Sequence, residues 1–123
     1  MPTEVSDAEV EQLRKSFKRC REGTADAIIE LRRTGDTALV QTIVRGIVWR
    51  YLQEESRSVL DQATPDTPLS SLGVDSLMML EVVLDIQDAL EITIDDSDLR
   101  KLHTIGDVIE FLTEQVAAKN KAC

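Results

Sequence analysis

The stretch LGVDSL at residues 72–77 separates a polar loop from an apolar helix that the sequence predicts. Its glycine provides a turn, after which an acidic residue and a hydroxyl residue open the apolar run. With Asp75 as N-cap, Ser76 takes the first helical position, beside unpaired backbone N–H groups and the positive end of the helix dipole. The segment therefore predicts a serine hydroxyl that projects into solvent, in a place that suits an attached phosphate.

The helix predicted from Ser76 to about Leu90 has two contrasting faces. At 100° per residue, its buried face gathers Met79, Val82, Val83, Ile86 and Leu90. The opposite face carries Leu77, Leu80 and Leu84 together with Glu81, Asp85 and Asp88. Acidic residues alone usually indicate a face exposed to solvent, but with three leucines among them this face is more apolar than a solvent-exposed face is expected to be. This face is therefore predicted to be a docking surface for a partner.

Residues 36–74 predict one helix followed by one long loop. From a cap at Asp36 or Thr37, apolar residues recur at the spacing of a half-buried helix; they are Val40, Ile43, Val44, Ile47, Val48 and Tyr51. Residues 54–74 carry prolines, a glycine and several small polar residues, which is typical of a loop. Because about 20 residues without regular structure are unusual in a compact domain, we expect anchors, namely Val59, Leu60, Leu69 and Leu72.

After residue 90 the sequence predicts a short helical turn at residues 96–101 and a final helix. Thr104 and Asp107 have the spacing of a capping box at the start of that helix. Its inward residues recur at helical spacing and are Ile105, Val108, Ile109, Leu112 and Val116. The predicted fold is all-α, a four-helix bundle of three main helices and one short helix.

The first 35 residues predict a separate helical extension. Ser6 and Glu9 have capping-box spacing, and we expect Gly23 to end the helix that follows them. A second apolar segment at residues 25–31 leads to Gly35, which is placed to end it in the left-handed conformation. Five of the basic residues of the extension gather in its first part, namely Arg14, Lys15, Lys18, Arg19 and Arg21. We therefore divide the chain into an extension (1–35), a main domain (36–118) and a C-terminal tail (119–123).

Composition narrows the classes of function. The net charge is −9, all of it carried by residues 36–123, because acids and bases balance in residues 1–35. This charge disfavours nucleic acid and anionic membrane surfaces as partners. No apolar run approaches the roughly 20 residues of a membrane span, and the acidic N-terminus lacks a secretory signal, so a cytoplasmic protein is expected. Cys20 and Cys123 are expected to be free thiols, and the single histidine, His103, indicates no metal site.

Taken together, these features resemble the acyl carrier protein family. The motif DSL at residues 75–77, followed by Glu81 and an apolar helix, is similar to the phosphopantetheine attachment site of that family. The resemblance extends from about residue 37 to residue 116 and leaves residues 1–35 outside. One departure is Met78, because the corresponding position is frequently acidic in members that serve fatty acid synthesis.

The resemblance implies a cofactor and a role. A phosphopantetheinyl transferase would attach 4'-phosphopantetheine covalently to Ser76, within a motif completed by Asp75 and Leu77. The thiol of this arm would carry acyl groups as thioesters in fatty acid, lipid or polyketide-type biosynthesis. The chain would then be a monomeric carrier without catalytic residues of its own. Ketosynthase, acyltransferase and other acyl-processing enzymes would use basic patches of their own to dock on this chain. The docking residues here would be Leu80, Glu81, Leu84, Asp85 and Asp88.

Other functions remain open at this stage. Asp75 and Ser76 commonly do no more than cap a helix. A hydrolytic serine is disfavoured because the G-x-S-x-G elbow is absent and His103 is the only possible histidine base. A peptidyl or aminoacyl carrier would share the fold and the arm, and a helical adaptor without cofactor would use only the mixed face of residues 76–90.

Overall fold

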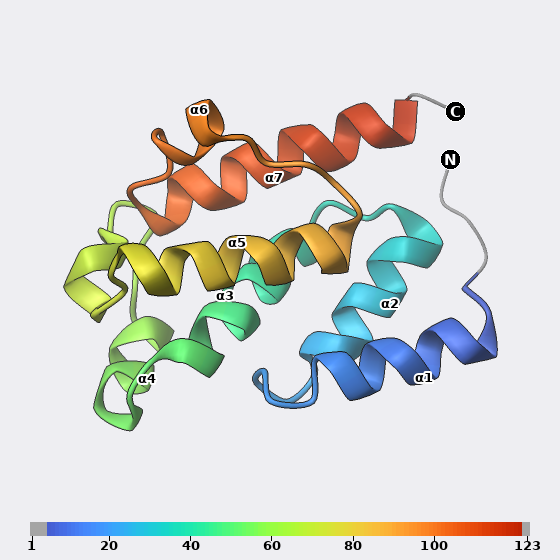
Figure 1. Ribbon diagram of the computed structural model, residues 1–123, viewed down its shortest axis with the longest axis horizontal. Helices are drawn as coiled ribbons and strands as arrows, with labels where there is room; N and C mark the ends of the chain where they lie inside the picture. Colours follow the sequence, from blue (N-terminus) through green and yellow to red (C-terminus); the bar gives the residue numbers. More distant parts are fainter. Residues whose placement is uncertain (1–4, 122–123) are drawn as a thin grey trace.

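The computed structural model describes residues 5–121, and Cys123 lies outside this range. The regular elements in this range are all helices, with no strand among them. The only extended pairing in the described range is an isolated bridge between Pro68 and Thr104. The elements are α1 (Asp7–Ser16), α2 (Thr24–Thr34), α3 (Leu39–Tyr51), α4 (Glu54–Asp61), a 3-10 helix η1 (Leu69–Leu72), α5 (Ser76–Leu90), α6 (Asp96–Leu99) and α7 (Ile105–Lys121) (Figure 1). The prediction of an all-α fold is confirmed.

The bundle is formed by α3, α5 and α7, with the short α6 between the last two. α3 contacts both α5 and α7, and in Figure 1 α3 lies behind α5, with α7 drawn above. Each of the three helices contributes completely buried side chains to one core, among them Ile43, Ile47, Ile86, Ile105 and Leu112. The three main helices therefore lie where the hydrophobic periodicity predicts them, although Tyr51, Met79 and Ile109, predicted to face the core, are only half-buried. The short helix lies within the turn predicted at residues 96–101 and ends at Leu99.

The segment predicted as a loop contains a helix, so this prediction is wrong for residues 54–61. α4 packs against the end of α3, where Arg45 donates to the carbonyl oxygens of Leu60 at 2.9 Å and Ala63 at 3.0 Å. Leu60 is buried as expected, and so are Leu69 and Leu72, but Val59 is 51% exposed and anchors nothing. Two acidic residues in the first turn of α4 favour a helix here through the helix dipole.

The extension forms two helices that pack on the bundle near the C-terminal end of α5 (Figure 1). The Ser6 side chain caps α1 by accepting from the backbone N–H of Glu9, as predicted. Gly23 does not end α1, which stops at Ser16; it precedes α2 instead, with a positive φ of 92°. Gly35 ends α2 in the left-handed conformation, as predicted.

Apolar side chains of the extension join the same core as the bundle. Ile28 of α2 is completely buried, and Leu13 and Phe17 are nearly so. The backbones of α2 and α3 approach so closely that a Cβ atom on Gly46 would lie 1.9 Å from Thr24 Oγ1. The extension is thus a packed layer of the structure, in continuous contact with residues 36–118.

Two helix ends differ from their predicted positions. α3 begins at Leu39, because the Asp36 carboxylate accepts from the N–H of Ala38 and stabilises a turn ahead of the helix. α7 continues to Lys121, so the first residues grouped with the tail are helical. Lys119 Nζ there donates to the carbonyl oxygens of Leu90 and Glu91, at 3.2 Å each, and so holds the end of α5.

Candidate functional site

The site begins with the turn that leads into α5. η1 ends at Gly73, whose φ of 90° lies in the left-handed region that favours glycine. The N–H of Gly73 donates to the Ser70 carbonyl at 3.1 Å and that of Val74 to the Leu69 carbonyl at 3.3 Å. The buried side chain of Val74 holds the turn against the core, and Asp75, the residue that follows it, lies at the surface.

Asp75 and Ser76 adopt the arrangement that the sequence predicts. Asp75 has an extended backbone, and its carboxylate Oδ1 accepts from the N–H of Met78 at 2.8 Å, which makes it the N-cap of α5. Ser76 is the first residue of the helix and is exposed. Its hydroxyl therefore lies at the positive end of a four-turn helix, where a phosphate ester is favoured electrostatically.

A cavity of about 260 Å³ opens beside Ser76. Its lining residues include Leu69, Val74, Met79 and Leu102, which are apolar, and His103 and Asp75, which are polar. An arm attached to the Ser76 hydroxyl fits this setting, because the hydroxyl is free to solvent and an apolar recess lies next to it.

The segments on both sides of the cavity are joined by backbone hydrogen bonds. The N–H of Leu69 donates to the His103 carbonyl at 2.9 Å, and the N–H of Ile105 donates to the Thr67 carbonyl at 3.1 Å. Gly106 donates to the Pro65 carbonyl at 2.9 Å. The loop before the serine is therefore fixed to the start of α7.

His103 and Asp107 form no hydrolytic arrangement with Ser76. The carboxylate of Asp107 accepts from the backbone N–H groups of His103 and Thr104, at 3.1 Å each, and Thr104 Oγ1 accepts from Asp107 in return. These backbone bonds lower the pKa of Asp107. The carboxylate thus completes the predicted capping box of α7 rather than orienting an imidazole.

The outward face of α5 is apolar and acidic, as predicted. Leu77, Leu80 and Leu84 are 67%, 49% and 59% exposed. Glu81 and Asp88 are exposed among them. Exposed leucines that follow one another along the helix from Ser76 provide an apolar stripe with an acidic border.

Asp85 differs from the other acids of this helix because α3 engages it. Its carboxylate accepts from the Tyr51 hydroxyl at 2.5 Å and from Arg50 Nη1 at 3.3 Å, and its side chain is 20% exposed. Burial and then the bond to Asp85 raise the pKa of the Tyr51 hydroxyl. Sequence reasoning misses this cluster, because Arg50 and Tyr51 lie more than 30 residues away and carry no local signal for the pairing.

The described residues hold neither a metal site nor a membrane span. No group of three or more His, Cys, Asp and Glu side chains between residues 5 and 121 could bind a metal ion. Within the same range, no helix has the length and apolar character to cross a membrane.

Comparisons with known proteins point to one family. A family model described as a phosphopantetheine attachment site matches residues 48–112, slightly more than half of the chain. An acyl carrier protein of Exiguobacterium sibiricum is 41% identical over 64 residues, which cover 52% of this chain and 76% of the relative. That of Desulforapulum autotrophicum is 31% identical over 74 residues, covering 58% and 96%. No solved structure matches the chain significantly. The family match contains Ser76 and excludes α1 and α2.

Proposed function

Because the chain belongs to the acyl carrier protein family, we propose that Ser76 is its attachment residue for 4'-phosphopantetheine and that its pathway is fatty acid, lipid or polyketide-type biosynthesis. The observation that carries the assignment of the residue is the exposed Ser76 hydroxyl at the first position of α5, inside the matched range. The chain is a carrier and not an enzyme. Asp75 fixes the start of the helix, and Leu77 stands exposed beside the attachment point.

In the attachment step, the chain needs to do little more than expose the Ser76 hydroxyl to the transferase. Ser76 Oγ would lose its proton and form a bond to the phosphorus of the pantetheine phosphate of coenzyme A, while adenosine bisphosphate leaves. The transferase supplies the catalysis, and the α5 N-terminus stabilises the phosphate that stays on the chain. When bound, the arm supplies a terminal thiol that holds acyl groups as thioesters.

Docking of partner enzymes is proposed to use the outward face of α5. Leu80 and Leu84 offer exposed apolar area, and Glu81 and Asp88 offer exposed negative charge. A phosphopantetheinyl transferase, a ketosynthase and an acyltransferase would approach through basic surfaces, for which charge steering gives fast and transient association. Asp85 contributes less than its neighbours, because Arg50 and Tyr51 already engage its carboxylate.

The division of the chain into residues 1–35, 36–118 and 119–123 remains a proposal. It is supported by the family match, which lies wholly inside the middle segment. Since Ile28 and other apolar residues of the extension are buried in the common core, we expect a chain of residues 36–123 to accept the arm but to melt at a lower temperature than the full chain. Loading followed by mass and a thermal melt measure both effects. An unfolded truncated chain would contradict the division.

The central experiment is intact-mass analysis of the full chain after incubation with coenzyme A and a phosphopantetheinyl transferase. The mass should rise by one phosphopantetheinyl group, and Ser76→Ala should abolish the addition. Ser70→Ala is the matched control, since Ser70 is also exposed and lines the same cavity. An unchanged mass of the unmodified chain would overturn the proposal. Parallel loading with fatty acyl and aminoacyl donors separates an acyl carrier from a peptidyl or aminoacyl carrier.

A further inference from the structure

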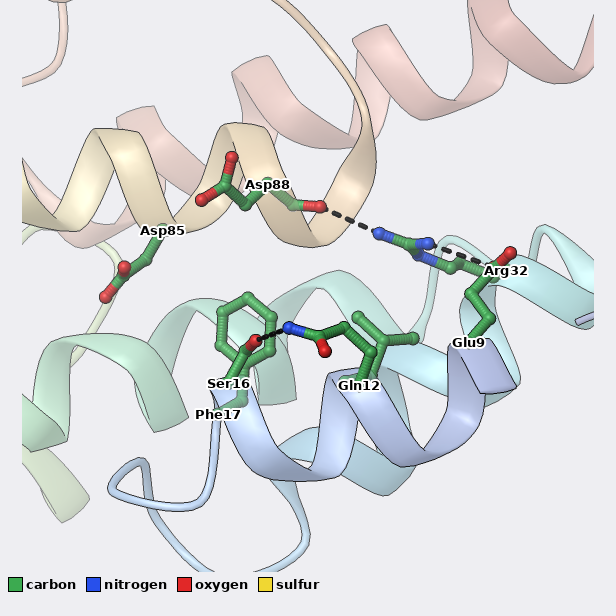
Figure 2. A pocket seen from close by; sticks show the side chains of 8 residues that line it. Glu9, Gln12, Ser16, Phe17, Arg32, Asp85 and Asp88 are labelled. Atoms are coloured by element: carbon green, nitrogen blue, oxygen red, sulfur yellow. Dashed lines mark hydrogen bonds and ion pairs between the residues drawn. The ribbon is translucent and has the colours of Figure 1, made fainter. Parts of the chain in front are cut away.

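A second hollow, of about 430 Å³, lies between α1 of the extension and the C-terminal half of α5. Figure 2 shows its two walls: Gln12 and Ser16 come from α1, Phe17 follows directly after it, and Asp85 and Asp88 come from α5. The family match does not include α1, so this wall is an addition of the present chain to the helix on which partners are proposed to dock.

The α1 wall is held in a fixed position against α5. Arg32 of α2 donates to the carbonyl oxygens of Asp88 at 2.7 Å and Ala89 at 3.0 Å, and its Nη1 contacts Glu9 Oε2 of α1 at 3.1 Å. Its side chain is only 12% exposed. Phe17, at the floor of the hollow, is buried. The hollow is therefore formed before any partner arrives.

The free charge at the hollow is negative. Arg32 Nη1 pairs with both Glu9 and Glu91, and Arg50 pairs with Asp85. Asp88 is exposed and makes no ion pair among residues 5–121. Leu84, which is exposed but does not line the hollow, lies one helical turn before Asp88 on α5, so an apolar group and an acid lie next to each other along this helix at the edge of the hollow. The α1 wall presents an amide and a hydroxyl, since Gln12 Nε2 donates to Ser16 Oγ at 3.0 Å.

We propose that the docking surface of this carrier has two walls, and that a basic amphipathic helix of an acyl-processing enzyme seats between α1 and α5. A lysine or arginine of that helix pairs with Asp88, and its aliphatic residues cover Leu84, while Gln12 and Ser16 bound it on the other side. An anionic segment is repelled by the same acids. The extension would then affect which enzymes bind, because an enzyme surface that fits α5 alone would collide with α1. This inference rests on the proposed carrier function.

The test is an NMR titration of the isotope-labelled full chain with a synthetic amphipathic helical peptide of lysine and leucine. The amide signals of Gln12, Ser16, Leu84 and Asp88 should shift together and saturate at one peptide per chain. Gln12→Arg should weaken binding about fivefold, because it places a positive charge in the wall. Glu11→Gln is the matched control: it changes the net charge by the same amount at an exposed α1 position outside the hollow. Its affinity should stay within about twofold of the unmodified chain.

Other outcomes overturn the proposal. Shifts confined to α5, or no binding at all, would show that α1 forms no wall of the docking surface. Equal weakening by Gln12→Arg and Glu11→Gln would show that only the overall charge matters. Ser16→Arg, in the same wall, repeats the test if Gln12→Arg fails to fold, which the amide spectrum reveals. Addition of the arm to Ser76 is read separately by mass, so failure of the proposed function is distinguishable from failure of this inference.

Discussion

Arg32 Nη2 donates to the backbone carbonyl of Asp88 at 2.7 Å, across 56 residues of chain. The neighbouring Nε donates to the carbonyl of Ala89, so one guanidinium satisfies two acceptors in the last turn of α5. Helix C-termini leave such carbonyls without partners inside the helix. The extension thereby contributes a cap that the α5 helix lacks in its own sequence.

Replacement of Arg32 by methionine should lower the free energy of unfolding by about 2–3 kcal/mol, because part-buried carbonyls lose their donors. Urea denaturation measures the change. Arg33→Met is the control, since Arg33 is exposed on the same helix, and it should change stability by less than about 0.5 kcal/mol. Equal effects of the two substitutions would argue against the cap.

Gly46→Ala tests the close contact between α2 and α3. Alanine favours a helix over glycine by about 1 kcal/mol, yet its Cβ would lie 1.9 Å from Thr24 Oγ1. We expect a net destabilisation of about 1–3 kcal/mol from the overpacking. Thr24→Gly should relieve the clash, so that Gly46→Ala costs less in that background. A stabilising Gly46→Ala would show that the two helices are not in close contact.

Asp107 makes stability depend on acid pH. Hydrogen bonds from the N–H groups of Thr104 and His103 lower the pKa of Asp107 in the folded chain. The stabilisation is complete above the unfolded-state pKa of about 3.9 and is lost as the pH falls through the lower folded-state pKa. Melting curves between neutral and strongly acidic pH should show Asp107→Asn less stable than the unmodified chain at neutral pH. The difference should shrink below about pH 4, and a constant difference would contradict the linkage.

Cys20 should be unreactive in the folded chain. Burial raises the pKa of its thiol to about 11, with a further contribution from the negative charge of Asp85. At pH 8 roughly one thiol in a thousand is then thiolate, against about a quarter for an unfolded cysteine of pKa about 8.5. In a Cys123→Ser background, alkylation should therefore be at least about 100-fold slower in buffer than in urea. Rapid labelling of the folded chain would contradict the burial of Cys20.

The approximate bounds predicted for α5 match the observed Ser76–Leu90, because a glycine turn, an N-cap and a strong apolar periodicity all act at short range there. The same holds for the capping box of α7. α4 is missed because its eight residues bury only Leu60, which is too little to produce a periodic pattern. The signal that was present is the acidic pair Glu54 and Glu55 in its first turn.

Contacts between distant residues account for the rest. Nothing near Arg32 indicates that it reaches the end of α5, and nothing near Asp85 indicates that Tyr51 and Arg50 engage its carboxylate. The extension also looks separable in sequence, since it has its own caps and a neutral charge. Its burial against α3 follows from the shapes of Gly46 and Thr24, which hydrophobic periodicity does not reveal.

The backbone hydrogen bonds between residues 65–69 and 103–106 also determine when, during synthesis, the turn ahead of Ser76 can fold. The ribosome completes the serine segment well before residues 103–106 leave the exit tunnel, so the turn ahead of Ser76 has no partner during that interval. Closing a loop of this length carries an entropic cost that only the collapse of the later helix repays. If Ser76 is the attachment residue, as proposed, we expect the transferase to modify only finished chains, so that the arm would report that folding is complete.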